Sequence, residues 1–338
     1  MRRGKSEMSN RGKIALVLAG GQIGMKFNPQ TNTCQPNVTA DEMLSWLPAE
    51  IAEKIFVVDW SRQPSSHYTI RMTADLIQVL SKTVIDGADG IVVTCGTDTL
   101  EEMAYLTDLC WAYPQPVIFT AGALPSDSRG ADASINLYQS VLAAFSRECW
   151  GAGVLVCLQD QLFAASEITE TACHRRNAFS APDRGPVGQL ILDRVEILRQ
   201  YKRSQVLEEK SSPARNVELL FASLGGNDNY IEFLAADENS NLDGLVIAGF
   251  GSGNIPPSWI PHVKKLVKED IPVVITSRCH QGHTRGMPYT FEGNMARLIE
   301  IGVLDGGGLR PVQARIKLSV AIGAGLSRQE IQSYLLEG

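Results

Sequence analysis

The stretch Leu16-Val17-Leu18-Ala19-Gly20-Gly21-Gln22-Ile23-Gly24-Met25 decides the fold that we expect for this chain. Apolar residues run directly into two glycines, and a further glycine follows. This pattern is typical of a buried strand that turns sharply at its carboxyl end in a parallel sheet. The turn would hold the side chain of Gln22 at the mouth of the sheet, where open α/β proteins bind ligands.

The same glycines have two simpler interpretations, which remain open at this point. One is a structural turn without a function. The other is a nucleotide-binding loop, because glycines let backbone N–H groups approach a phosphate. However, Ala19 stands where the dinucleotide motif requires its first glycine, and no phosphate-loop motif with a lysine is present.

Short apolar runs alternate with helical patterns through the first half of the chain. Ile70, Ala74, Ile77, Leu80 and Val84 recur at spacings of three and four, which places them on one face of a helix. This alternation predicts an α/β fold with a doubly wound parallel sheet and helices on both faces. The expected strands are Ile14–Leu18, Ile55–Asp59, Ile91–Cys95, Val117–Thr120 and Val154–Leu158.

The polar segment around Ser211-Ser212-Pro213 lacks a sustained period and is interpreted as a linker. We therefore expect an N-terminal domain at 1–200 that carries the site, a linker at 201–215 and a smaller α/β domain at 216–338. The second domain should contain strands Leu245–Ala248 and Val273–Thr276, with helices near Trp259–Lys268, Asn294–Ile301 and Pro311–Ala321.

Charge and composition limit the classes of partner. The net charge is −6 and the basic residues are scattered, which argues against nucleic acid and acidic membranes and favours a small ligand. The seven cysteines are odd in number and form no Cys-x-x-Cys pair, so reduced cysteines in a cytoplasmic protein are expected. We see no signal peptide and no apolar segment near the ~18 residues of a membrane span.

Further motifs lie at the ends of other predicted strands. Thr97 and Asp98 follow one strand in the stretch 94–102, where they either face a ligand or merely cap a helix. Asn254 ends a glycine-rich stretch at 249–254, which suggests either close backbone approach to a ligand or a plain turn. The stretch 279–283 contains two histidines, but its spacing favours a loop over a zinc site, and we predict no metal and no cofactor.

Taken together, these motifs resemble the asparaginase/glutaminase family of bacterial type from Lys13 to Leu335. The signatures are Gly20-Gly21-x-Ile23-Gly24, Gly96-Thr97-Asp98-Thr99-x-Glu101-Glu102, Pro116-Val117-Ile118-Phe119-Thr120-x-Gly122-Ala123 and Gly249-x-Gly251-x-Gly253-Asn254-Ile255-Pro256. Cys279-x-x-Gly282 and Tyr289 look more like the cytosolic type. That resemblance implies a homodimer or homotetramer in which each site is completed at a subunit interface.

The resemblance assigns substrate-binding roles that this chain keeps. Ser61 would hold the α-carboxylate of an amino acid, Asp98 its α-ammonium group, and Asn254 would come from the neighbouring subunit. Thr97 would belong to a Thr-Lys-Asp group. The resemblance also places Gly21, Gly96 and Ala121 at the substrate.

The reactive residues of the family are replaced. Gln22 stands at the position of the first nucleophile, and a carboxamide has no ionisable oxygen for attack. Ala19 replaces the first threonine of the turn, and the segment Met25–Val38 lacks the tyrosine that would activate the nucleophile. Glu170 replaces the catalytic lysine, and Cys95 replaces a usual histidine.

A site shared by Asp98 and Glu170 should raise the pKa of one of them, which would make an acid–base pair. In the alternative, Glu170 points into solvent. We therefore expect an enzyme that acts on a small amino acid, its amide or a derived lactam, through Glu170, Asp98 and Thr97, with Gln22 orienting the ligand. Cys95 is a weaker candidate nucleophile. Two alternatives are an inactive homologue that binds an amino acid or a partner, and residual asparaginase activity through Thr97.

Overall fold

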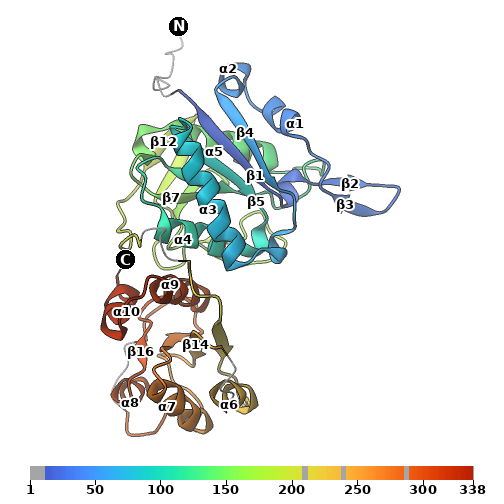
Figure 1. Ribbon diagram of the computed structural model, residues 1–338. Helices are drawn as coiled ribbons and strands as arrows, with labels where there is room; N and C mark the ends of the chain where they lie inside the picture. Colours follow the sequence, from blue (N-terminus) through green and yellow to red (C-terminus); the bar gives the residue numbers. More distant parts are fainter. Residues whose placement is uncertain (1–11, 208–211, 237–240, 285–288, 338) are drawn as a thin grey trace. The chain divides into compact units, whose positions relative to one another are not determined.

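The computed structural model describes residues 12–207, 212–236, 241–284 and 289–337 (Figure 1). The chain divides into two compact units, Met1–Lys202 and Arg203–Gly338. The boundary falls close to the predicted end of the first domain. In the described residues, no helix is long and apolar enough to cross a membrane.

The first unit is built on one eight-stranded sheet with the order β12-β11-β8-β7-β6-β5-β1-β4. Its parallel part contains all five predicted strands, as β1 (Ile14–Ala19), β4 (Ile55–Ser61), β5 (Gly90–Cys95), β6 (Val117–Thr120) and β7 (Val154–Leu158). The sheet is not purely parallel, because three antiparallel strands extend it beyond β7. They are β8 (Gln161–Ala164), β11 (Gly188–Ile191) and β12 (Arg194–Ile197).

A tight turn explains why the sheet changes direction after β7. Gln159 and Asp160 both have positive φ, at 52° and 64°, which matches the right-handed twist of a two-residue hairpin. The turn contains no glycine or asparagine, so no clear hairpin signal is visible in the sequence. The additional strands therefore correct the expectation of an all-parallel sheet.

Helices cover both faces of this sheet, as the apolar strands predict. On one face, α3 (Ile70–Ile85) and α4 (Leu100–Cys110) bury Leu76, Leu80 and Met103 against the sheet. On the other, α5 (Ala133–Phe145) packs with the short helices α1 (Ala40–Ser45) and α2 (Ala49–Ala52). In Figure 1, α3 crosses in front of the sheet and α5 lies behind it.

Small elements complete the first unit. A hairpin of β2 (Lys26–Asn28) and β3 (Thr33–Gln35) protrudes from it (Figure 1), and β9 (Thr169–Glu170) pairs with β10 (Phe179–Ser180). Single 3-10 turns lie at η1 (Gln22–Gly24), η2 (Ser65–His67), η3 (Thr97–Thr99) and η4 (Arg147–Cys149).

The second unit is a smaller α/β unit, as predicted. Its parallel sheet has the order β13 (Val217–Phe221), β14 (Gly244–Gly249), β15 (Val273–Ser277) and β16 (Leu304–Asp305). Its helices are α6 (Asn229–Ala236), α7 (Ile260–Lys268), α8 (Met295–Glu300), α9 (Pro311–Gly323) and α10 (Arg328–Leu335), with a 3-10 turn η5 (Pro257–Trp259).

Part of the expected linker is bound into this second unit. The Lys317 ammonium is fully buried and donates to the Ser204 hydroxyl oxygen at 2.9 Å and to the Glu337 carbonyl at 2.5 Å. The Ser204 hydroxyl in turn donates to the same carbonyl at 3.2 Å. Ser204 is therefore a packed residue rather than part of a free connection.

The carboxyl ends of β1, β4, β5 and β6 lie at one edge of the first sheet. Ala19 is paired with Ser61 on one side and with Cys95 on the other, and Thr94 is paired with Thr120. The turns that follow these strands therefore begin side by side. The candidate site is built from these turns.

The turns after β1 and β5 are in backbone contact. Gly21 has a φ of 84°, and a Cβ atom there would lie 2.3 Å from the amide nitrogen of Gly96 and 2.4 Å from the carbonyl carbon of Cys95. No side chain fits this space. The glycine is therefore required both by its backbone conformation and by the proximity of the neighbouring turn.

We predict that Gly21→Ala lowers the free energy of unfolding by about 3 kcal/mol, since it combines strained backbone with a steric clash. Gly87→Ala is the matched control, because Gly87 also has a positive φ of 98° but a Cβ atom added there would meet no atom within 4 Å. Gly87→Ala should lower the free energy of unfolding by roughly 1–2 kcal/mol, which is the cost of the backbone strain alone. Urea unfolding followed by circular dichroism measures both, and equal losses would contradict the close contact.

Candidate active site

A buried serine and an exposed aspartate meet at this edge of the sheet. The Ser65 side chain is 3% exposed, and its hydroxyl donates to Asp98 Oδ2 at 3.1 Å. The Thr99 hydroxyl donates to the Ser65 carbonyl oxygen at 3.0 Å, which joins η3 to η2. A Cβ atom on Gly96 would lie 2.3 Å from Ser65 Oγ, so a glycine at 96 leaves room for this serine.

Ser61, which the resemblance assigned to the substrate carboxylate, has other partners. Its Oγ accepts a hydrogen bond from the Gln63 N–H at 3.3 Å. Ser61 also forms a hydrogen bond with the Tyr68 hydroxyl. Burial raises the pKa of Tyr68, and the hydrogen bond with Ser61 opposes this increase. The Tyr68 hydroxyl donates to the Ala19 carbonyl at 2.9 Å. Ser61 thus helps to hold the turn after β4, and Ser65 is the serine that contacts Asp98.

Sequence reasoning did not single out Ser65 as the serine beside Asp98. It considered Ser61, which ends β4, whereas the chain continues through Pro64 before η2 returns Ser65 to the edge of the sheet. The available signal was the short polar run Pro64-Ser65-Ser66 directly before a helix. The substrate-binding role of Ser61 stays a prediction.

Glu170 lies close enough to Asp98 for their charges to interact. It sits on β9 opposite Phe179 of β10 and is partly exposed. Burial raises the pKa of the Glu170 carboxyl, and the charge of Asp98 raises it further. The raised pKa of Glu170 agrees in direction with the effect that we expected for one of the two acids. A site shared by Asp98 and Glu170, and the direction in which the Glu170 side chain points, stay predictions.

Gln22 and Thr97 each follow one of the two glycines in contact. Gln22 is exposed at the start of η1, and Thr97 is partly exposed at the start of η3. Neither side chain forms a hydrogen bond with another residue in the described part of the chain. Both are therefore available to a ligand that lies against the Gly21–Gly96 contact.

Cys95 is poorly suited to act as a nucleophile. Its side chain is fully buried in the core between the sheet and α3 and α4. Burial raises the pKa of the Cys95 thiol far above its ordinary value. Because the thiolate is the reactive form, this cysteine is expected to be inert.

Ala121 belongs to the loop that follows β6. Its side chain is buried, and its carbonyl oxygen accepts a hydrogen bond from Asn136 Nδ2 at 2.9 Å. The next residue, Gly122, packs against η1, since a Cβ atom there would lie 3.3 Å from the Cα of Ile23. The loop therefore supports the turn that carries Gln22.

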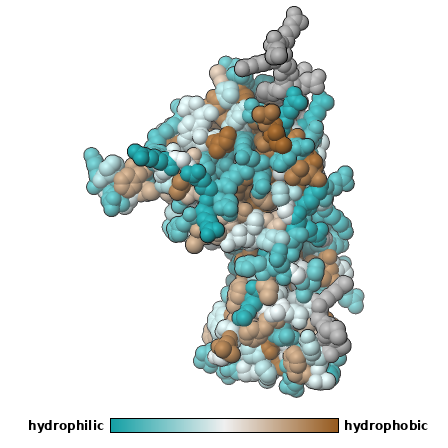
Figure 2. All heavy atoms as spheres, turned by 180° about the vertical axis from the view of Figure 1, so that it is seen from behind, coloured by the Kyte–Doolittle hydropathy of each residue, from teal (hydrophilic) through white to brown (hydrophobic). Residues whose placement is uncertain are grey.

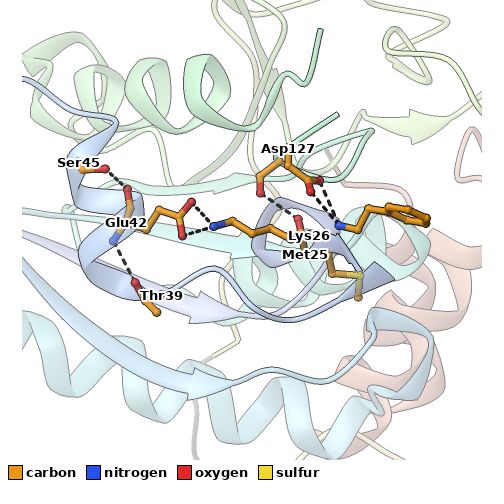
Figure 3. A network of polar contacts seen from close by, with 8 residues as sticks. Met25, Lys26, Thr39, Glu42, Ser45 and Asp127 are labelled. Carbon is orange, nitrogen blue, oxygen red and sulfur yellow. Dashed lines mark hydrogen bonds and ion pairs between the residues drawn. The ribbon is translucent and has the colours of Figure 1, made fainter. Parts of the chain in front are cut away.

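The segment Met25–Val38 is a hairpin whose base is anchored (Figure 3). Lys26 Nζ pairs with the Glu42 carboxylate at 2.6 Å, and the Phe27 N–H donates to Asp127 at 3.1 Å. The Met25 carbonyl accepts from both the amide and the hydroxyl of Ser126, each at 2.9 Å. The ammonium group of Lys26 is thus held by Glu42, and the segment brings no tyrosine to the site.

Asn254 lies in the second unit, in the glycine-rich turn after β14. Its amide N–H donates to the Phe250 carbonyl at 2.9 Å. Its side-chain Oδ1 is buried and has no hydrogen-bond partner among the described residues. A buried acceptor without a partner costs about 1–3 kcal/mol, which a ligand or a second subunit could recover. Its role at a neighbouring subunit's site stays a prediction.

No group of three or more histidine, cysteine, aspartate or glutamate side chains within the described ranges could hold a metal ion. The polar groups that these ranges bring together are the hydroxyls of Ser65 and Thr97, the Gln22 amide and two carboxyls. This set can bind an ammonium group and transfer protons.

The raised pKa of Glu170 predicts a pH-dependent stability. The ordinary pKa of a glutamate is about 4.5, so the Glu170 carboxyl of the unfolded chain ionises as pH rises above this value. In the folded protein the same carboxyl ionises only at higher pH. The free energy of unfolding therefore falls with rising pH until the pH passes the raised pKa of the folded state. Glu170→Gln should therefore gain stability relative to the native protein between acidic and neutral pH. Urea unfolding from pH 4 to 8 measures this, with the exposed Glu148→Gln as control. A constant difference across this range would contradict the shared site.

The two serines can be separated by substitution. Ser65→Ala should weaken binding of L-asparagine or L-aspartate about tenfold, the usual effect of losing a hydrogen bond to a charged group. Ser61→Ala should change the dissociation constant by less than about twofold. Isothermal titration calorimetry measures both, and the reverse order of effects would return the binding role to Ser61.

Comparison with known proteins identifies the family of the chain. The family model of the asparaginase N-terminal domain matches residues 13–203, and that of the glutaminase/asparaginase C-terminal domain matches residues 216–335. The L-asparaginase of Bacillus licheniformis is 27% identical over 92% of this chain and 96% of its own length. The probable L-asparaginase of Deinococcus radiodurans is 30% identical, with coverage of 96% and 98%.

Two further similar proteins match nearly the whole chain. The L-asparaginase 2 of Bacillus subtilis is 27% identical over 98% of this chain and 88% of its own length. The crystal structure of a probable cytoplasmic L-asparaginase from Campylobacter jejuni has a TM-score of 0.86 and 25% identity, and covers 97% of this chain and 100% of that chain. The chain therefore belongs to the asparaginase family of amidohydrolases, with both of the family's domains.

Proposed function

We propose that this protein is an asparaginase-family enzyme that acts on a C–N bond of a small amino acid, its amide or a derived lactam. In place of a threonine at position 22, the chemistry would use the carboxyls of Glu170 and Asp98 together with the Thr97 hydroxyl. One contact carries the proposal: the Ser65 hydroxyl fixes the Asp98 carboxylate at 3.1 Å, and the charge of this carboxylate adds to the effect of burial in raising the pKa of Glu170. A raised pKa makes a carboxylate a stronger base and lets its acid form persist to higher pH.

The proposed roles follow from the charge of each group. An ionised Asp98, fixed by the Ser65 hydroxyl at 3.1 Å, binds the substrate's ammonium group. The Thr97 hydroxyl and the Gln22 amide are free to donate hydrogen bonds to the substrate, for example to the oxygen of the scissile carbonyl.

In the hydrolytic form of the reaction, ionised Glu170 takes a proton from water while the water oxygen attacks the carbonyl carbon. The C–N bond then breaks, and the same proton passes from Glu170 to the leaving nitrogen. Amide or lactam plus water thus gives acid plus amine. Ring closure is the same sequence in reverse.

This scheme explains why the usual residues are dispensable. A nucleophilic hydroxyl at position 22 needs a nearby base or cation, and an ammonium group near Thr97 would stabilise an alkoxide. A carboxylate at position 170 destabilises such an alkoxide but is a suitable base for water. The changes at 22 and 170 are therefore chemically consistent with each other.

The direct test incubates the protein with amino-acid amides and lactams and follows ammonia release and mass change. We expect Glu170→Gln to lower kcat by ~10²–10⁴, the usual contribution of a general acid–base group, and Thr97→Val to lower it less. Glu148→Gln, an exposed change away from the site, is the control. Ligand binding without turnover of any compound in the panel would show instead an inactive homologue that binds an amino acid.

The double variant Gln22→Thr/Glu170→Lys tests the change of chemistry. It should lose the native reaction and gain L-asparagine hydrolysis, because a hydroxyl and an ammonium group replace the amide and the acid. If the native protein hydrolyses L-asparagine and Thr97→Val alone abolishes that activity, Thr97 is the nucleophile and the proposal is wrong. Steady-state assays with L-asparagine separate these cases.

A further inference from the structure

Three arginines gather on two loops that flank the candidate site. Arg129 lies on the loop after β6, and Arg175 and Arg176 lie on the loop that joins β9 to β10. The loops touch, because a Cβ atom on Gly130 would lie 2.2 Å from a terminal guanidinium nitrogen of Arg176. All three side chains are exposed, and His174 adjoins them. We refer to Arg129, Arg175 and Arg176 as the arginine rim.

The arginine rim has no anionic partner within the described part of the chain. None of its side chains forms an ion pair or hydrogen bond there, whereas Arg62, Arg199 and Arg297 each pair with a carboxylate. The carboxylates of the β6 loop have other partners. Asp127 accepts from the Phe27 N–H, and Asp132 accepts from the Ala123 N–H at 2.9 Å. The guanidinium groups of the arginine rim are therefore not paired with a carboxylate in the described residues, although Asp127 and Asp132 lie on the same loop as Arg129.

Both loops also border the residues of the candidate site. The β6 loop packs on η1 beside Gln22, through the Gly122 contact with Ile23 and the bonds from Ser126 to Met25. The β9–β10 hairpin carries Glu170 at its base and Arg176 in its loop. Figure 2 shows hydrophilic side chains gathered beside the base of the protruding β2–β3 hairpin.

Groups of opposite charge thus lie on connected elements. Glu170 lies at the base of the β9–β10 hairpin, and Arg175 and Arg176 lie in its loop, which meets the loop after β6 at Gly130. Such an arrangement complements a ligand that is cationic at one end and anionic at the other, since each end meets the opposite charge.

We propose that the substrate carries an anionic group beyond the scissile bond, and that the arginine rim binds it. The guanidinium fork matches carboxylate and phosphate groups in geometry, so the shared chemistry is a carboxylate or phosphate tail on an amino-acid amide. This inference rests on the proposed function, because it uses Asp98 and Glu170 as the inner end of the site. It makes the arginine rim the element that determines specificity.

The test uses amides that differ only in their tail. All carry the β-L-aspartyl group on a carboxamide nitrogen, and the tails are ethanolamine, phosphoethanolamine and L-glutamate. We expect the phosphate or carboxylate compound to bind about tenfold more tightly than the neutral one, as expected for a charged hydrogen bond. The preferred tail distinguishes a phosphate from a carboxylate substrate. The preference should shrink at high salt because the rim is exposed.

Variants then assign this preference to the arginine rim. Arg176→Gln and Arg129→Gln should each remove most of the preference and leave binding of the ethanolamine compound unchanged. Arg147→Gln is the matched control, an exposed arginine that follows α5. It lies by the opposite edge of the sheet, since the Ala144 carbonyl packs on Gly90 at the start of β5. Calorimetry gives the dissociation constants, and unfolding curves confirm that each variant is folded.

The outcomes separate this inference from the proposed function. Tail-dependent binding without turnover would overturn the enzyme and keep the arginine rim as a ligand site. Turnover with equal affinity for all tails would overturn the inference and keep the enzyme. Binding of total tRNA that requires the same arginines, without any tail preference, would overturn the small-molecule proposal in favour of a nucleic-acid surface.

Discussion

The site depends on one contact, in which the backbone of Gly21 lies against the backbone of Cys95 and Gly96. The contact leaves no room for a Cβ atom at position 21, and it joins the turns after two neighbouring strands. The other residues of the site lie next to this contact. Gln22 and Thr97 follow the two glycines, and Ser65 fits against Gly96 only because that residue lacks a side chain. The edge of the sheet thereby acquires a fixed arrangement of polar side chains.

The electrostatics of this surface differ from those that a hydroxyl nucleophile needs. Burial raises the pKa of Glu170, and the charge of Asp98 raises it further. Lys26 is held by Glu42 at the base of the β2–β3 hairpin. An alkoxide would be unfavourable beside two carboxyls, whereas a protonated carboxyl beside an ionised one is a practical proton donor. In the proposed function, Gln22 and Glu170 therefore act together.

The loops around the candidate site hold the elements that carry its residues. The loop after β6 packs on η1 through Gly122, binds the hairpin through Ser126 and Asp127, and meets the β9–β10 loop at Gly130. One irregular segment thus holds three elements around the opening. Loops on a rigid sheet commonly carry the residues that distinguish substrates, and the arginine rim has this location.

The sequence by itself determined the class of fold, the five parallel strands, the two domains and most of the motif positions, because apolar runs and glycines act locally. It also shows a glutamine at position 22 and a glutamate at position 170, where the resemblance to the family leads us to expect a threonine and a lysine. Only the tertiary structure decided that the sheet ends in antiparallel strands, since the turn at Gln159 and Asp160 has no glycine signal. It also decided that Ser65 contacts Asp98, that Cys95 is buried, and that the loop of Arg176 meets the loop after β6 at Gly130. These facts depend on which distant segments come into contact, and that follows from packing rather than from local pattern.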